Sequence, residues 1–116
     1  MARREMSEQA FLVLAALAGE PTHGYGVVQA VAELSKGRVA LRVGTLYGVL
    51  DRLAADGLVE LDREEAHEGR LRRYYRLTND GERVLAHEAQ RLAENARVAT
   101  ERLRQRGLRP ATGGVA

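Results

Sequence analysis

The chain has 116 residues, a length that allows one domain and a short appendage. Hydrophobic residues make up 45% and charged residues 29%, ordinary globular values that exclude wholesale disorder. Cysteine is absent, which excludes disulfides, thiol catalysis and thiolate metal sites. The net charge is only +2, but all 18 basic residues except Lys36 are arginines, whose planar fork suits phosphate and guanine. Composition is therefore compatible with nucleic-acid binding.

Residues 8–18 are good helix formers, with Ser7 as a candidate N-cap and Gly19 as a stop. Arg3 and Arg4 before an apolar stretch are also typical of a signal peptide. Nearby acidic residues argue against that alternative, as does a stretch far shorter than the roughly 20 residues needed to cross a bilayer. We therefore predict a helix in a cytoplasmic protein with no membrane partner. A helix that is apolar nearly all round must be covered on two sides, which predicts a partner subunit.

Two further helices are predicted at residues 23–35 and 43–56. In the first of these, apolar and small side chains recur at spacings of three and four, and Lys36-Gly37 ends the helix. We predict Tyr25 in the core on this basis. The second helix ends at Gly57, and its predicted buried stripe consists of Leu46, Val49, Leu50 and Leu53.

After the third helix the hydrophobic period changes from about 3.6 to about 2 residues, which indicates strands. Val59 and Leu61 alternate with acidic residues, so we expect a half-buried first strand. A polar stretch with Gly69 forms the predicted turn, and a second strand follows that alternates arginine with tyrosine. The result is a β-hairpin with a charged tip.

A long last helix is predicted at residues 79–106, with Thr78 as its cap and residues 107–116 as a flexible tail. Its apolar residues recur at alternating spacings of four and three, the pattern of a coiled-coil seam. An exposed stripe of this length requires a partner, and the same helix of a second subunit would cover it together with the first helix. The predicted homodimer interface consists of Phe11, Leu12, Leu85, Ala89, Leu92, Ala96, Ala99 and Leu103.

The order of these elements predicts a mainly α fold with a β-hairpin wing: a winged helix-turn-helix at residues 1–77 and a dimerisation helix at residues 78–106. In such a domain one helix enters the major groove of DNA, and the hairpin lies against the backbone or minor groove. The predicted DNA-binding residues are Arg42, Gly44, Thr45, Tyr47, Gly48, Arg52, Arg70, Arg72 and Arg73.

The helix residues of this set have structural alternatives. Thr45 is also a candidate N-terminal cap, and Tyr47 a packing residue against the wing. Gly44 and Gly48 lower helix propensity by up to about 1 kcal/mol each, which either close approach to DNA or close packing on the second helix would explain. Arg52 has acidic neighbours with which it can pair.

The wing arginines also have an alternative, a salt-bridged, solvated turn with Glu64, Glu65 and Glu68. A surface ion pair is worth only about 0–1 kcal/mol, so these carboxylates would hold an arginine away from phosphate only weakly. Arg73 is the weakest of the three candidates, because strand alternation places it on the inner face.

No catalytic or metal-binding constellation is present in the sequence. His23, His67 and His87 are widely separated and lack a spacing that suits metal ligands. His23, at the start of the second helix, is better explained as a structural hydrogen-bonding residue. No nucleophile has a matched base, and no glycine-rich loop follows a strand. We therefore predict a protein that is not an enzyme and needs no cofactor.

A set of uncommon short motifs spans about residues 7–92. The motifs are His23-Gly24-Tyr25, Gly44-Thr45-Leu46-Tyr47, Leu50 with Arg52-Leu53, Gly57-Leu58, Gly69-Arg70, Arg72-Arg73-Tyr74-Tyr75, Leu77-Thr78 and Gly81. Together they resemble the PadR family of transcriptional regulators, and the single C-terminal helix is similar to the family's small subgroup. The resemblance implies a dimeric, effector-responsive repressor with a palindromic operator near a promoter. Some small members stack flat aromatic drugs on a tryptophan of the C-terminal helix, and this chain departs from them in having none.

The leading functional hypothesis is a homodimeric repressor that binds double-stranded DNA and is released by a small aromatic or hydrophobic effector. That effector would bind between the first and last helices at the dimer interface, where small side chains leave room. One alternative is a winged-helix module that binds a protein partner and has no specific DNA binding. Another is a metal-sensing repressor, which would require zinc uptake that depends on histidine.

Overall fold

The structure, a computed structural model, describes residues 6–107. Its helices and strands are α1 Glu8–Gly19, β1 Thr22–His23, α2 Gly24–Leu34, α3 Val43–Ala55, β2 Val59–His67, β3 Arg70–Leu77 and α4 Asn79–Gln105. The chain divides into two compact units, one up to Leu85 and one from Ala86 onward. Arg3, Arg4 and all of the predicted tail except Gly107 lie outside the described residues.

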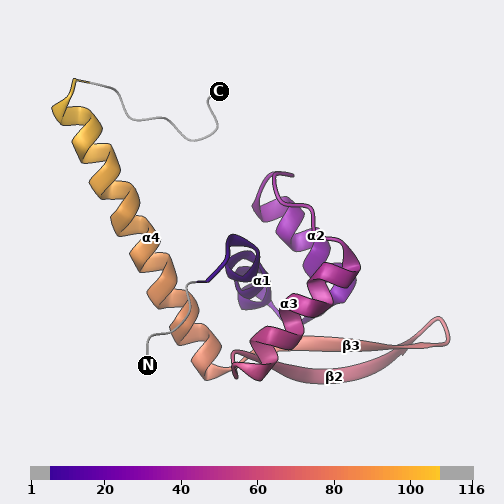
Figure 1. The fold of residues 1–116 in the computed structure, drawn as a ribbon. Coiled ribbons are helices and arrows are strands. Elements are labelled where there is room, and N and C mark those ends of the chain that lie inside the picture. The colour runs from indigo at the N-terminus through magenta and orange to yellow at the C-terminus, as the bar shows by residue number, and fades with distance from the viewer. Residues whose placement is uncertain (1–5, 108–116) are drawn as a thin grey trace. The chain divides into compact units, whose positions relative to one another are not determined.

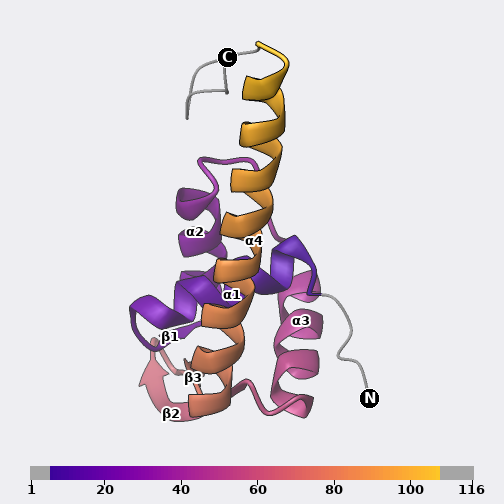
Figure 2. The same cartoon turned by 90° about the vertical axis from the view of Figure 1, so that its left-hand side faces the viewer.

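The first helix has the predicted cap and packs against two others. The side-chain oxygen of Ser7 accepts a hydrogen bond from the backbone N–H of Ala10 at 3.1 Å, which supplies a partner to one free donor of the first turn. Figure 2 shows α1 lying across α2 and α3. Its predicted interface residues Phe11 and Leu12 are half-buried within the single chain.

The core of the first unit is wholly apolar among the described residues and draws on all three short helices. The segment between α2 and α3 also contributes, because Val39 and Leu41 are buried, and the Ser35 hydroxyl oxygen accepts from the N–H of Val39 at 2.9 Å. The buried residues are Val13, Leu14, Ala16, Leu17, Val27, Val31, Val39, Leu41, Leu46, Leu50, Leu53, Leu58 and Val59. Burial of this apolar surface is the main force that holds the helices on the sheet.

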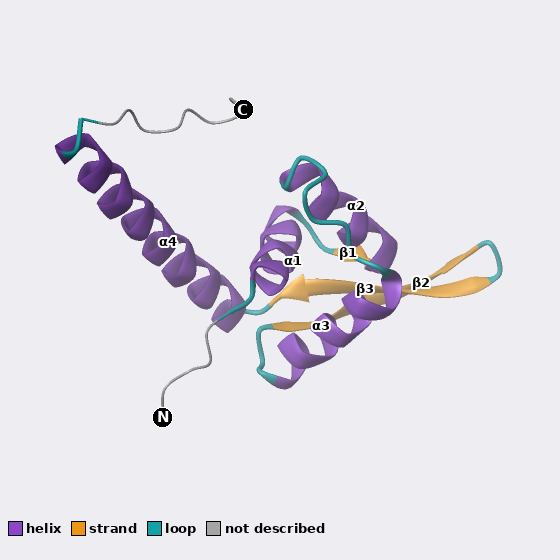
Figure 3. Ribbon diagram, turned by 45° about the horizontal axis from the view of Figure 1, so that its top comes forward, coloured by secondary structure: helices purple, strands orange, loops and turns teal. Residues whose placement is uncertain are grey.

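The sheet contains a strand that the sequence did not predict. Its order is β1-β3-β2, with Thr22 opposite Tyr75 and His23 opposite Tyr74 (Figure 3). Two residues are too few to show a strand period, so β1 is recognisable only through its pairing with β3. The pairing ties the start of α2 directly to the wing.

The hairpin has a tight turn and a bulge. Glu68 and Gly69 form a two-residue loop with φ of 51° and 78°, the positive values of a type I′ turn. The register shifts between Leu61 and Arg63, so Asp62 is an extra residue in β2. Leu61 is 46% exposed, and its predicted burial is therefore wrong. The outer part of the hairpin extends beyond the helices (Figure 1).

The second helix buries a different face from the one predicted. Tyr25 is 61% exposed, so its predicted place in the core is wrong. Gly24, Val27 and Val31 form the buried face instead. The apolar pattern did not count Gly24, whose missing side chain makes room for the ring of Tyr47.

The last helix is capped as predicted. The Thr78 hydroxyl oxygen accepts from the N–H of Gly81 at 2.9 Å and donates to the carbonyl of Gly57 at 2.6 Å. Within the first unit Gly81 is buried, and Val84 and Leu85 pack against the core.

From Ala86 onward the apolar side chains of α4 are largely exposed. Leu92 and Leu103 of the predicted seam are exposed, and so is Val98, which the sequence analysis overlooked. Ion pairs one turn apart, Arg91–Glu88 and Arg97–Glu94, lie along the helix. No helix within residues 6–107 is long and apolar enough to cross a membrane.

Gly81→Ala is expected to destabilise the protein by about 1–3 kcal/mol, because the added methyl group would overlap the backbone carbonyl oxygen of Leu58. Urea unfolding followed by circular dichroism measures the change. Gly19→Ala is the matched control: it also adds a methyl group to a helical glycine, but in open space. Equal stability of the two variants would show that the contact with Leu58 does not constrain the fold.

Candidate nucleic-acid interface

A groove of about 710 Å³ lies between the start of α2, one side chain of α3 and the hairpin. Its lining combines aromatic and basic side chains and includes Tyr25, Tyr47, Arg70, Arg72 and Arg73. Tyrosine hydroxyls and arginine guanidinium groups are donors that proteins commonly direct at phosphate. The groove is therefore the strongest candidate for an interface with a nucleic-acid backbone.

Tyr47 closes one side of the groove. A Cβ atom built on Gly24 would lie only 2.7 Å from the Tyr47 hydroxyl oxygen, so the ring lies against the start of α2. The side chain is nevertheless 41% exposed. The alternative prediction had Tyr47 packing against the wing. The ring packs on α2 instead, and it remains accessible to solvent.

The other predicted residues of α3 form an exposed surface that does not line the groove. Thr45 is not the N-cap, because Arg42 occupies that position and makes no side-chain cap bond. A Cβ at Gly44 or Gly48 would meet nothing within 4 Å, so close packing on α2 does not explain these glycines. Arg52 is exposed and makes no ion pair within residues 6–107.

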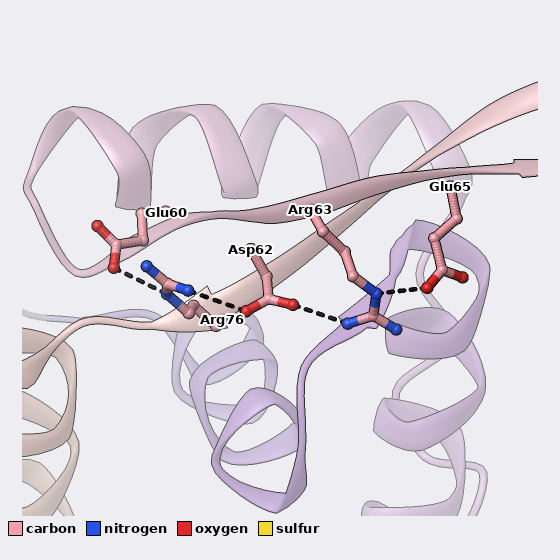
Figure 4. Close-up of polar contacts among 5 residues, drawn as sticks. All are labelled: Glu60, Asp62, Arg63, Glu65 and Arg76. Carbon is pink, nitrogen blue, oxygen red and sulfur yellow. Dashed lines mark hydrogen bonds and ion pairs between the residues drawn. The ribbon is translucent and has the colours of Figure 1, made fainter.

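An ion-pair network runs along one face of the hairpin (Figure 4). Arg76 donates to Glu60 at 2.9 Å and to Asp62 at 3.0 Å. Arg63 donates to Asp62 at 2.7 Å and to Glu65 at 2.6 Å. The bulge places the Asp62 carboxylate between the two guanidinium groups. Among the acids predicted to neutralise the wing, only Glu65 is in the network, and it pairs with Arg63.

The network pairs charged side chains of the hairpin, but none of its members lines the groove. Hydrogen bonds from Arg63 and then Arg76 lower the pKa of Asp62, and those from Arg63 lower the pKa of Glu65. Both carboxylates therefore stay ionised at neutral pH.

No carboxylate pairs with Arg70, Arg72 or Arg73 in the part of the chain that the structure describes. Arg73 is exposed and Arg72 half-buried, so the expected position of Arg73 on an inner, covered face is wrong. Strand alternation alone therefore does not bury Arg73.

His23 was predicted as a structural residue, and the structure confirms that role. Its Nδ1 accepts the N–H of Gly26 at 3.2 Å and so caps α2. Its ring meets Tyr74 edge-on at 5.3 Å between centroids, and its Nε2 lies 3.3 Å from Nη1 of Arg72. Partial burial, and then the charges of Arg72 and His67, lower the pKa of His23. Sequence reasoning missed both His23 and Tyr25 as groove residues, although the His-Gly-Tyr motif marked them.

Asp62→Asn is expected to lower stability at neutral pH, because it removes the carboxylate shared by two arginines. The folded-state pKa of Asp62 is below its ordinary value of 3.8, so its contribution is present above that value and lost as pH falls through the lowered pKa. Urea unfolding of variant and wild type should therefore differ at neutral pH and converge in acid. Glu64→Gln, which removes a hairpin carboxylate without an ion pair in residues 6–107, should leave stability unchanged. A pH-independent difference for Asp62→Asn would contradict the assignment.

Comparison with protein families gives a match over most of the chain. The model described as "Transcriptional regulator PadR-like family" matches residues 13–87. Among curated proteins, Transcriptional regulator Rv3488 of Mycobacterium tuberculosis is 39% identical over 80 residues, which are 69% of this chain and 71% of that protein. The matched span contains all the residues that line the groove.

Solved structures confirm the predicted winged helix-turn-helix fold. A PadR family transcription regulator from hypervirulent Clostridium difficile R20291 matches with a TM-score of 0.71 and 23% identity, over 84% of this chain and 99% of that one. Bacillus subtilis PadR, solved in complex with operator DNA, matches with a TM-score of 0.62 and 18% identity, over 69% of this chain and 45% of that one. At these identities the likeness is one of fold.

Proposed function

Because the chain belongs to the PadR-like family of transcriptional regulators, we propose that it binds a palindromic DNA operator as a homodimer and represses transcription. Family membership also confirms the prediction that the chain is a regulator and not an enzyme. In the proposed complex the exposed face of α3 enters the major groove. The hairpin lies along the flanking backbone.

The observation that carries this proposal is the division of the hairpin arginines into two sets. Arg63 and Arg76 are held by carboxylates, whereas Arg70, Arg72 and Arg73 line the groove without a carboxylate partner in the described residues. DNA phosphates would supply the missing negative charge. The likeness in fold to a PadR protein solved in complex with operator DNA supports DNA as the ligand.

Arg70→Gln and Arg73→Gln are each expected to weaken DNA binding to all sequences and to make its salt dependence shallower. Loss of one phosphate contact per subunit changes the log–log slope by roughly 2 for a dimer. Fluorescence anisotropy with labelled duplex DNA from upstream of the gene, titrated at several salt concentrations, measures both effects.

Arg76→Gln is the matched control, because it removes the same charge from the same strand but from an arginine held in the ion-pair network. It should change the slope much less. A wild-type protein whose DNA affinity does not depend on salt would contradict the proposed contacts, and so would equal slopes for Arg73→Gln and wild type.

Gly48→Ala is expected to change stability and DNA binding in opposite directions. Alanine favours the helix and meets open space, so the free energy of unfolding should rise by about 0.5–1 kcal/mol. In the complex the same methyl group would clash with DNA, and we expect an affinity loss on the order of tenfold. Fluorescence anisotropy measures the DNA affinity and urea unfolding measures the stability, with Gly19→Ala as the control. A more stable variant with unchanged affinity would remove Gly48 from the interface.

The homodimer is proposed from the exposed apolar residues of α4, namely Leu92, Val98 and Leu103, together with the half-buried Phe11 and Leu12. The alanines of the seam, Ala89, Ala96 and Ala99, would allow close helix approach. Sedimentation equilibrium tests this assembly. A chain that is monomeric at the concentrations at which it binds DNA would contradict it.

The effector is proposed as a small aromatic or hydrophobic molecule bound in the dimer interface. No tryptophan is available to stack on it, so aliphatic and small side chains of the seam would form its site. Release from DNA would require a coupling of about 1–3 kcal/mol, or roughly 5–150-fold in affinity. Anisotropy of the protein–DNA complex titrated with phenolic compounds and flat aromatic drugs tests this. A complex that none of them dissociates would contradict the proposed effector class.

A further inference from the structure

The cap on α2 fixes which nitrogen of His23 carries a hydrogen. Nδ1 accepts the backbone N–H of Gly26 at 3.2 Å, so it bears no hydrogen itself. A neutral imidazole has one accepting and one donating nitrogen. The hydrogen is therefore on Nε2, the nitrogen that lines the groove side of the ring beside Arg72.

This arrangement sets two donors next to each other. Nε2 of His23 lies 3.3 Å from Nη1 of Arg72, and a guanidinium group has donors only. Neither group can accept a hydrogen bond from the other, so the two donors do not satisfy each other in spite of the short distance. A single acceptor within reach of both nitrogens would satisfy both donors.

Within residues 6–107 no group accepts a hydrogen bond from His23 Nε2. From β3 the Tyr74 ring lies edge-to-face with it, from β2 His67 interacts with it electrostatically, and from α2 the Gly26 N–H donates to Nδ1. Partial burial, and then electrostatic interaction with Arg72 and His67, lower the pKa of His23, which keeps the imidazole neutral and the cap intact at neutral pH. An anionic oxygen is the complement of this site.

We propose that His23 Nε2–H and an Arg72 N–H together bind one phosphate oxygen of the DNA backbone at the start of α2. The inference rests on the proposed function and adds a neutral residue to its contacts. A phosphate oxygen accepts two hydrogen bonds, and the N-terminal end of α2 favours a negative charge at this place. His23 thus has two roles, as helix cap through Nδ1 and as DNA ligand through Nε2.

Two substitutions separate these roles. His23→Asn keeps an acceptor bonded to Cγ, where Nδ1 is, but places no group at Nε2. His23→Gln reaches the Nε2 position with an amide N–H but loses the acceptor of the cap. We expect His23→Asn to keep wild-type thermal stability and lose DNA affinity by roughly tenfold or more. His23→Gln should be less stable but bind DNA nearly as well as wild type.

A salt titration and a double-mutant cycle with Arg72→Met identify the shared oxygen. His23 is neutral, so His23→Asn should leave the log–log salt slope unchanged, whereas Arg72→Met should make it shallower by roughly 2 for a dimer. Because both groups bind one acceptor, the double variant should lose much less affinity than the product of the two single losses.

Anisotropy with labelled duplex DNA from upstream of the gene, and with a mixed-sequence duplex at low salt, gives these affinities. If wild type binds with the expected salt dependence but His23→Asn binds equally well, this inference is overturned and the proposed function stands. Equal losses for His23→Asn and His23→Gln, or strictly multiplicative losses with Arg72→Met, also overturn it. Absence of binding by wild type to either duplex would instead overturn the proposed function.

Discussion

The pairing of Thr22 and His23 with β3 is the constraint on which the candidate interface depends. It fixes the start of α2 against the wing strand, so that His23 meets both Tyr74 and Arg72. The buried contacts between the helix-turn-helix and the hairpin are apolar, and apolar packing is not directional. Main-chain pairing has a defined register, and the groove between the two elements inherits it.

Electrostatics then divides the hairpin arginines into two sets, those paired with carboxylates and those that line the groove. Ion pairs at a solvent-exposed surface contribute little to stability. The main effect of the network around Asp62 is that its carboxylates are already paired with Arg63 and Arg76. It takes up the nearby carboxylates with Arg63 and Arg76, and the arginines at the groove remain for an external anion. The β-bulge is the cause, because it inserts Asp62 between the two guanidinium groups. A net charge of +2 thus conceals a local surplus of positive charge.

The sequence predicted the elements with a repeating pattern or a capping residue, and it failed where tertiary contacts decide. The helices lie within a few residues of their predicted bounds, and the Ser7 and Thr78 caps are present. Strand β1 has no periodic signal, and the buried face of α2 includes Gly24, against which Tyr47 lies, rather than Tyr25. Which arginine pairs with which carboxylate on the hairpin depends on a one-residue bulge, and composition does not reveal that bulge.

The direct measurement of the central claim is nitrogen-15 NMR of the arginine side chains during titration with duplex DNA. If the groove binds the DNA backbone, the Nε–Hε signals of Arg70, Arg72 and Arg73 shift on addition of DNA. Those of Arg63 and Arg76, which already donate to carboxylates, stay in place. Shifts confined to Arg63 and Arg76, or spread equally over all five arginines, would contradict the account.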